Sequence, residues 1–162
     1  MKRQVWILTS ITVMILILAG SVFSESYKEP TILMRAANTE VFLNLDDIRE
    51  VGEQSLEATT RSSLKPASEH VYLGVQLKDL VRMAGIELYA EHQVLVKAAD
   101  GYVVALTGSE VLEENTVYLA YLIDGEPLAP RELGGSGPYQ LIIPEDAFSM
   151  RWCKYVMEIE VR

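Results

Sequence analysis

The chain has 162 residues, of which 49% are hydrophobic and 23% are charged; this is typical of one folded domain and leaves no room for two. Without Lys2 and Arg3, residues 25–162 hold 12 basic and 23 acidic side chains, a formal charge of −11. A nucleic-acid-binding protein would show a basic face, so we exclude nucleic acid as a partner.

The first 24 residues have the pattern of an export signal. Lys2 and Arg3 precede residues 5–23, which contain no charge, and the small residues Val22 and Ser24 offer a cleavage site. A 19-residue uncharged run is also just long enough to span a bilayer. We therefore expect residues 1–24 to be a cleaved signal peptide or a retained membrane anchor, residues 25–30 a spacer, and residues 31–162 an extracytoplasmic domain.

The first part of this domain predicts two strands and a short helix. Residues 31–35 and 40–45 read as strands joined by a turn. Asp46 is expected to cap a helix that Gly52 ends. Residues 55–63 are polar and rich in threonine, which fits an edge strand or a loop, and Pro66 predicts a break.

Residues 75–84 have the clearest helical pattern, with Gly85 as the stop. One apolar face is expected to hold Val75, Leu77, Leu80, Val81 and Ala84, while Gln76, Lys78, Asp79 and Arg82 lie mostly elsewhere.

The rest of the chain alternates strands and turns. Residues 93–99 and 102–106 are expected to form a hairpin around Asp100-Gly101. Thr107 with Glu110 fits a capping box, residues 116–123 a strand buried on both faces, and residues 139–143 a further strand. In a last strand, residues 152–161, alternation places Cys153, Tyr155, Met157, Ile159 and Val161 on one face and Trp152, Lys154, Glu158 and Glu160 on the other.

These elements predict an α+β domain with a mixed, largely antiparallel sheet and short helices.

The sequence contains no recognisable motif for several kinds of functional site. His70 and His92 are far apart and predict partly exposed side chains rather than a metal site. Residues 134–138, "GGSGP", match neither a nucleophile elbow nor a phosphate-binding loop, which leaves a hairpin loop or an anion-binding nest of backbone N–H groups. Cys153, the one cysteine, is expected to be buried and inert.

Four blocks in order carry a resemblance: "YLGVQLKDLVRMAGI" (72–86), "VLVKAADGYVVALTGSEVL" (94–112), "VYLAYLIDGEPLAP" (117–130) and "GGSGPYQLIIPEDAFSMRWCKYVMEIEV" (134–161). Together they resemble the molybdopterin-binding domain of the sulfite oxidase family of oxidoreductases. The resemblance implies that fold, and a molybdenum ion held by a pyranopterin and by a cysteine thiolate, a soft and strongly donating ligand. It also implies Arg and Lys contacts to the cofactor's phosphate and pterin.

The residues that the resemblance would carry over are mostly changed. The family's cysteine lies in a strand that corresponds to "SLEATTRSS" (55–63), where Ala58 to Thr60 occupy its neighbourhood. The family's arginine falls on Gln140, and the asparagine of its turn falls on Asp124, which would repel a phosphate. Lys154 matches a basic position and Arg151 is close enough to assist it.

Three functions remain open. The missing cysteine argues against a molybdenum-dependent oxidoreductase or cofactor-binding subunit. We favour a non-catalytic module that binds a small ligand or a protein partner where the family binds its cofactor, because a fold does not fix a function. A carrier or sensor could bind molybdopterin without catalysing a reaction.

The candidate residues surround the position of the family's cofactor cleft: Arg61, Asp124, Arg131, Gly134, Gly135, Ser136, Arg151 and Lys154. Of these, the candidate cofactor-binding residues are Lys154, Arg151, Gly134, Gly135, Ser136 and Arg61. Convergence of Arg61, Arg151 and Lys154 would favour an anionic ligand.

Overall fold

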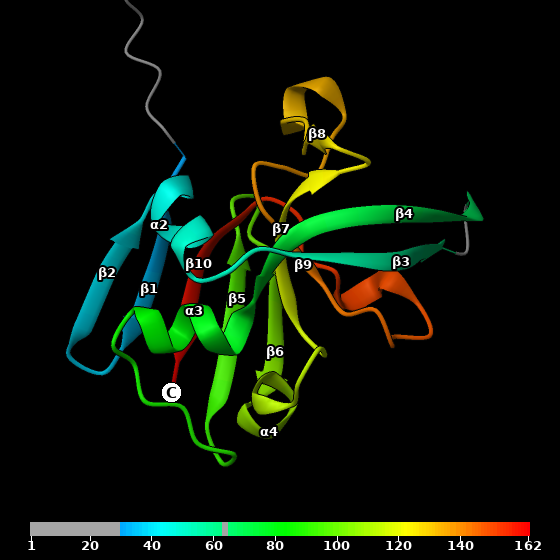
Figure 1. Ribbon diagram of the computed structural model, residues 1–162. Coiled ribbons are helices and arrows are strands. Elements are labelled where there is room, and N and C mark those ends of the chain that lie inside the picture. The colour runs from blue at the N-terminus through cyan, green and yellow to red at the C-terminus, as the bar shows by residue number, and fades with distance from the viewer. Residues whose placement is uncertain (1–29, 63–64) are drawn as a thin grey trace, which may run out of the picture.

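The computed structural model describes residues 30–62 and 65–162, and residues 62 and 65 without their side chains (Figure 1). The predicted signal or anchor, residues 1–24, lies outside the described residues. The strands are β1 (Ile32–Ala36), β2 (Thr39–Leu43), β3 (Gln54–Ser62), β4 (Lys65–Gln76), β5 (Gln93–Ala98), β6 (Val103–Thr107), β7 (Tyr118–Ile123), β8 (Glu126–Pro127), β9 (Gln140–Ile142) and β10 (Val156–Val161). The helices are α2 (Leu45–Glu50), α3 (Leu77–Met83) and α4 (Gly108–Leu112), with 3-10 turns η1 (Arg131–Leu133) and η2 (Ser149–Arg151).

The strands form two five-stranded sheets. The first has the order β2-β1-β10-β5-β6, and only β1 and β10 run parallel. The second has the order β3-β4-β7-β8, with β9 also beside β7, and is antiparallel throughout. This arrangement confirms the predicted α+β fold. Buried side chains from both sheets belong to one hydrophobic core, with Val96 and Leu119 fully buried.

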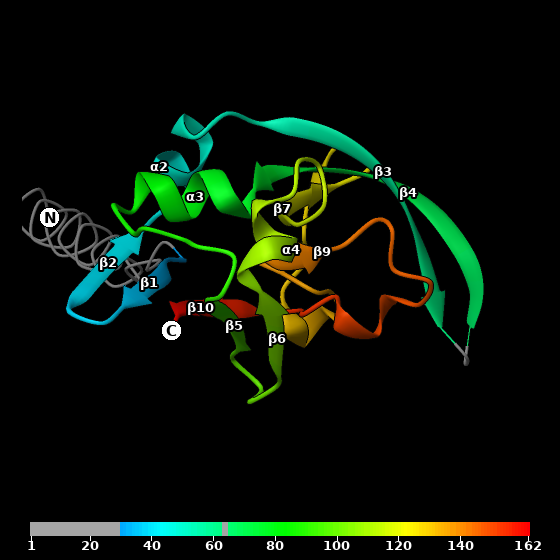
Figure 2. The same cartoon turned by 90° about the horizontal axis from the view of Figure 1, so that it is seen from below.

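Strands β3 and β4 form a long arm that extends away from the first sheet, and the segment between β9 and β10 lies beside it (Figures 1 and 2). For residues 55–63 the sequence allows an edge strand or a loop, and the structure has an edge strand, β3. The predicted break at Pro66 is wrong, because Pro66 lies within strand β4. A proline near the first residue of a strand costs no central ladder hydrogen bond.

Two helix predictions need correction. Asn44, not Asp46, caps α2: its side chain accepts from the Asp47 N–H while the Asp47 carboxylate accepts from the Asn44 N–H. Helix α3 begins at Leu77 because Val75 and Gln76 still pair with β7 as part of β4. The predicted apolar face is buried, but Lys78 is also buried, where it pairs with Glu114. A lysine can be buried at such a position when an acidic side chain pairs with it.

The last predicted strand is also too long. Strand β10 begins at Val156, because Tyr155 has a φ of 55° and the pairing with β5 shifts register between Val156 and Glu158. A bulge of this kind moves every preceding side chain to the other face. Val156 is therefore buried and Met157 is exposed, the reverse of the expected alternation.

No helix in residues 30–62 and 65–162 is long and apolar enough to cross a membrane. 

The first sheet contains an ion-pair cluster that predicts acid sensitivity. Glu160 accepts from the Arg162 Nε at 2.6 Å and from the Lys97 Nζ at 2.6 Å. Arg162 first, and then Lys97, lower the pKa of Glu160 to about 2. An unfolded glutamate titrates near about 4.3, so this stabilisation is complete above about pH 5 and is lost as the pH falls toward about 2. We expect Glu160→Gln to flatten the acid limb of the pH–stability curve in urea unfolding. An unchanged acid limb would contradict this, and Glu132→Gln, which removes an exposed carboxylate without an ion pair among the described residues, is the control.

Candidate functional site

A surface hollow of about 550 Å³ lies between the β3–β4 arm and the segment that joins β9 to β10. Strand β3 contributes Thr60 and Arg61, and β9 contributes Gln140. The joining segment contributes the rest. We call this the basic hollow, defined by Thr60, Arg61, Gln140, Phe148, Ser149, Met150, Trp152 and Lys154.

The joining segment is fixed against the arm by a hydrogen bond to Arg61 and a ring contact with Tyr72. The Arg61 N–H donates to the Ser149 Oγ at 2.9 Å, and this occupies a backbone donor on the outer strand β3. Trp152 is 4% exposed, and its Nε1–H donates to the Ile143 carbonyl at 3.0 Å. Its ring meets the Tyr72 ring edge-on at 6.0 Å. The hollow therefore has a rigid aromatic wall whose indole N–H is already used.

Two of the predicted cations meet here. Arg61 and Lys154 both line the basic hollow, and neither side chain forms an ion pair with another described residue. Arg151 is not part of this lining. It donates to the Asp146 carboxylate from Nε at 3.0 Å and to Glu110 from Nη1 at 2.7 Å, and these two carboxylates raise its pKa. Of the three cations whose convergence would favour an anionic ligand, two line one hollow and the third is paired with carboxylates outside it.

The glycine-rich loop lies outside the basic hollow. The N–H groups of Gly134, Gly135 and Gly137 donate to the carbonyls of Arg131, Pro130 and Ala129. Tyr155 closes the other side: its N–H donates to the Ser136 carbonyl and its hydroxyl to the Gly135 carbonyl. Three N–H groups that an anion nest would use are therefore already bonded inside the loop. A binding role for Gly134, Gly135 and Ser136 stays a prediction, but the structure does not bring them to Arg61 and Lys154.

Gln140 is the feature that sequence reasoning undervalued. It is 5% exposed, and its side-chain amide has no hydrogen bond to another described residue. The sequence marked Gln140 only as a replaced arginine. Phe148 and Met150, 58% and 77% exposed, were missed as well, although two large apolar side chains in a predicted loop are a usable signal.

A second hollow, of about 910 Å³, adjoins the first and shares Arg61 with it. We call it the acidic hollow, because its lining includes Glu57, Glu69, His70, Asp124, Glu145 and Asp146. Asp124 accepts from the Val71 N–H at 2.9 Å and lies 2.7 Å from the His70 Nδ1. The Val71 bond first, and then His70, lower the pKa of Asp124. Its carboxylate thus belongs to a site that repels anions.

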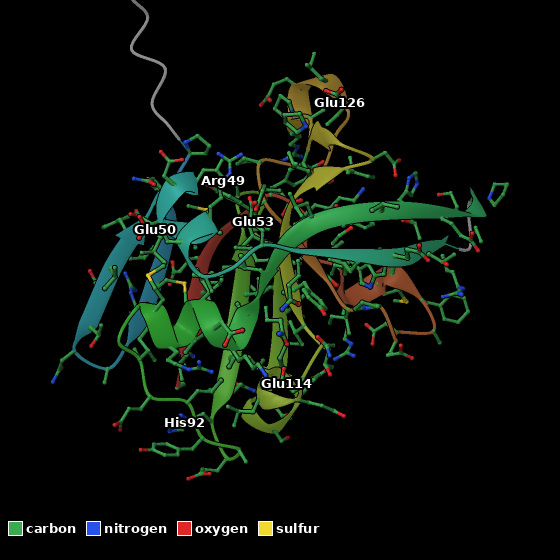
Figure 3. The ribbon with its side chains drawn as sticks, viewed as in Figure 1. Arg49, Glu50, Glu53, His92, Glu114 and Glu126 are labelled. Carbon is green, nitrogen blue, oxygen red and sulfur yellow. The ribbon has the colours of Figure 1, made fainter. Side chains whose placement is uncertain are left out.

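The histidines do not meet. His70 lies on β4. His92, labelled in Figure 3, lies in the loop that leads into β5. Both are partly exposed, as predicted. Within residues 30–62 and 65–162, no three His, Cys, Asp or Glu side chains are grouped so that they could hold a metal ion.

Cys153 is fully buried, which confirms that part of the prediction, although it precedes β10 rather than lying within it. Its Sγ is 3.9 Å from the Val96 carbonyl oxygen and 3.7 Å from that of Lys154. Burial raises the pKa of the thiol to about 11. At pH 8 the group is therefore a protonated thiol without access to solvent.

We expect Cys153 to resist alkylation in the folded protein. Because only the thiolate reacts, iodoacetamide at pH 8 should leave the native chain unmodified and add one carbamidomethyl group in urea, as read by mass spectrometry. Rapid labelling without urea would contradict this placement of the thiol. Free cysteine in the same tube controls for reagent activity.

The family model described as "Oxidoreductase molybdopterin binding domain" matches residues 36–162. Among solved structures, the chain is similar to the crystal structure of the sulfane dehydrogenase SoxCD from Paracoccus pantotrophus, with a TM-score of 0.67 and 16% sequence identity. The match covers 82% of this chain and 38% of that one, so this chain spans well under half the length of that protein. A search of curated proteins gave no match.

Proposed function

The chain belongs to the family of oxidoreductase molybdopterin-binding domains, and we propose that it is a non-catalytic member, exported or membrane-anchored, that binds a ligand or partner at the basic hollow. One observation carries the proposal. The only cysteine of the chain is buried in the core and does not line the basic hollow.

The residues present do not fit a molybdenum ion held by a protein thiolate. Strand β3 carries Ala58, Thr59 and Thr60 where the family resemblance places the ligand cysteine. Cys153 cannot replace it without a rearrangement of the core, because its sulfur faces the carbonyls of Val96 and Lys154. First-shell ligands set the reactivity of a metal site, so the fold alone does not support redox catalysis.

The groups that would hold the cofactor's phosphate are also reduced in number. Gln140 stands where the resemblance places an arginine and carries no charge. Arg151 is already paired with two carboxylates. This leaves Arg61 and Lys154 as the cations that line the basic hollow.

The location outside the cytoplasm is supported by the sequence of the first 24 residues, where two basic residues precede a 19-residue run without charge. A retained segment would hold the domain at the membrane surface, and a cleaved one would release it. Protease added to intact spheroplasts distinguishes these from a cytoplasmic protein, which would be protected.

The competing function is that of a molybdenum-cofactor-dependent oxidoreductase or cofactor-binding subunit, which family membership favours. To separate the two, the full-length chain is purified in detergent from a host that makes the cofactor, and pterin is released, oxidised and measured by its fluorescence. We expect no pterin above the level of a mock purification. Equimolar pterin would contradict the proposal that the basic hollow binds another ligand, and it would point to a carrier, a sensor or an enzyme.

A further inference from the structure

We propose that the basic hollow binds a small, singly charged organic carboxylate with an apolar body. This inference rests on the proposed function and deepens it, because it names the class of ligand that replaces the family cofactor. Four features of the hollow carry it: its cations without an ion pair, a glutamine amide without a hydrogen bond to another described residue, its apolar wall, and the absence of an acidic side chain from its lining.

The cations of this acidic chain are otherwise paired. Seven of the ten Lys and Arg side chains that the structure describes form ion pairs: Arg35, Arg49, Lys78, Arg82, Lys97, Arg151 and Arg162. Of the three that do not, Arg61 and Lys154 line the same hollow. Two cations that line one hollow without an ion pair create a local positive potential, which favours the binding of an anion.

Gln140 provides an independent observation. Its side chain is 95% removed from solvent, lines the basic hollow, and makes no hydrogen bond to another described residue. A polar ligand atom that reached this amide could accept from its N–H or donate to its oxygen.

The wall of the hollow suits an apolar body. Trp152 is held edge-on against Tyr72 and its N–H is occupied, so that its exposed surface can offer only apolar contact. Phe148 and Met150 stand largely in solvent at the rim, and an apolar ligand would cover them. A volume of about 550 Å³ is in the range for small-molecule sites.

The charge of the ligand follows from the surroundings. No Asp or Glu lines the basic hollow, whereas Glu57, Glu69, Asp124, Glu145 and Asp146 line the acidic hollow beside it. A cation would therefore bind in the acidic hollow, and a doubly charged phosphate ester would be repelled by it. A carboxylate needs only the donors of Arg61, Lys154 and Gln140.

The test is isothermal titration calorimetry on the full-length chain in detergent, with 4-phenylbutyrate as the probe. The neutral 4-phenyl-1-butanol tests whether charge matters, and phenyl phosphate tests the dianion. The peptide acetyl-Gly-Gly-Phe with a free carboxylate tests whether a peptide end is the source of the carboxylate. We expect saturable binding of a carboxylate probe with a Kd at or below about 1 mM, and binding of the alcohol at least about 10-fold weaker.

Variants place the binding in the basic hollow. Arg61→Gln and Lys154→Gln change exposed side chains and should each weaken the carboxylate probe by about 10-fold. Gln140→Met should do so as well, with urea unfolding to show that the chain still folds. Arg131→Gln is the matched control: it removes the third unpaired cation, which lies over the Tyr155 ring outside the hollow.

Several results would overturn the inference: no carboxylate binding at about 1 mM, equal binding of the alcohol, tighter binding of phenyl phosphate, or equal loss of affinity in Arg131→Gln. None of these bears on metal content, so a failure here leaves the proposed function standing. A molybdenum-bearing protein would sink the proposed function whatever the calorimetry shows.

Discussion

Gly74→Ala is expected to destabilise the domain by about 3 kcal/mol or more. Gly74 lies on β4 at the point where this strand pairs with Ala120 of β7, in the middle of the second sheet. An added Cβ would collide with the Leu119 carbonyl oxygen, and it would lie 2.7 Å from the Ala120 Cα. Both obstacles are backbone atoms of a buried strand, so no side chain can move aside.

Urea unfolding followed by circular dichroism measures the effect. Gly101→Ala is the matched control, because it also adds one methyl group to a glycine. Gly101 has a φ of 88° in the β5–β6 turn and open space around its Cα, so only backbone strain of about 1 kcal/mol is expected there. Equal midpoints for the two variants would show that β4 and β7 are not packed as closely as described.

Trp152→Ala is expected to cost about 3–5 kcal/mol and to collapse the wall of the basic hollow. Trp152 is 4% exposed, rests edge-on against Tyr72 and donates to the Ile143 carbonyl. Alanine would remove the ring from the core and leave that carbonyl without its donor. The same change should abolish carboxylate binding, since the segment 144–151 would lose its support.

Trp152→Phe separates these effects. Phenylalanine keeps a ring against Tyr72 but cannot donate to Ile143, so we expect a loss of about 1–2 kcal/mol. Circular dichroism in urea is the measurement of choice, because the substitution removes a fluorophore. If the alanine variant were as stable as the phenylalanine variant, Trp152 would not be the wall of a packed hollow.

The fold could be predicted in most of its parts because strands and turns leave local patterns. Residues 116–123 read as a buried strand, and β7 occupies most of them. The start of β10 could not be predicted, because Tyr155 has a positive φ and is held by residues distant in the sequence, among them Gly135 and Ser136. The burial of Lys78 also depends on a distant partner, Glu114, which no local pattern reveals.

Part of the lining of the basic hollow could be predicted from the sequence. Arg61 and Lys154 were named through the family resemblance and do line one hollow. Arg151 was named for its closeness to Lys154 along the chain, but Asp146 and Glu110 hold it elsewhere. The burial of Gln140 could not be seen from its neighbours in sequence, since an apolar strand can present a glutamine to either face.

Elemental analysis for molybdenum tests the central claim most directly. The full-length chain and its Cys153→Ala variant are purified in detergent from a host that makes molybdenum cofactor, beside a molybdenum enzyme made in that host as a loading control. We expect both chains to contain no more molybdenum than a mock purification, while the control enzyme contains its metal. About one molybdenum per chain would contradict it, and loss of that metal in Cys153→Ala would show that the buried thiol had become the ligand.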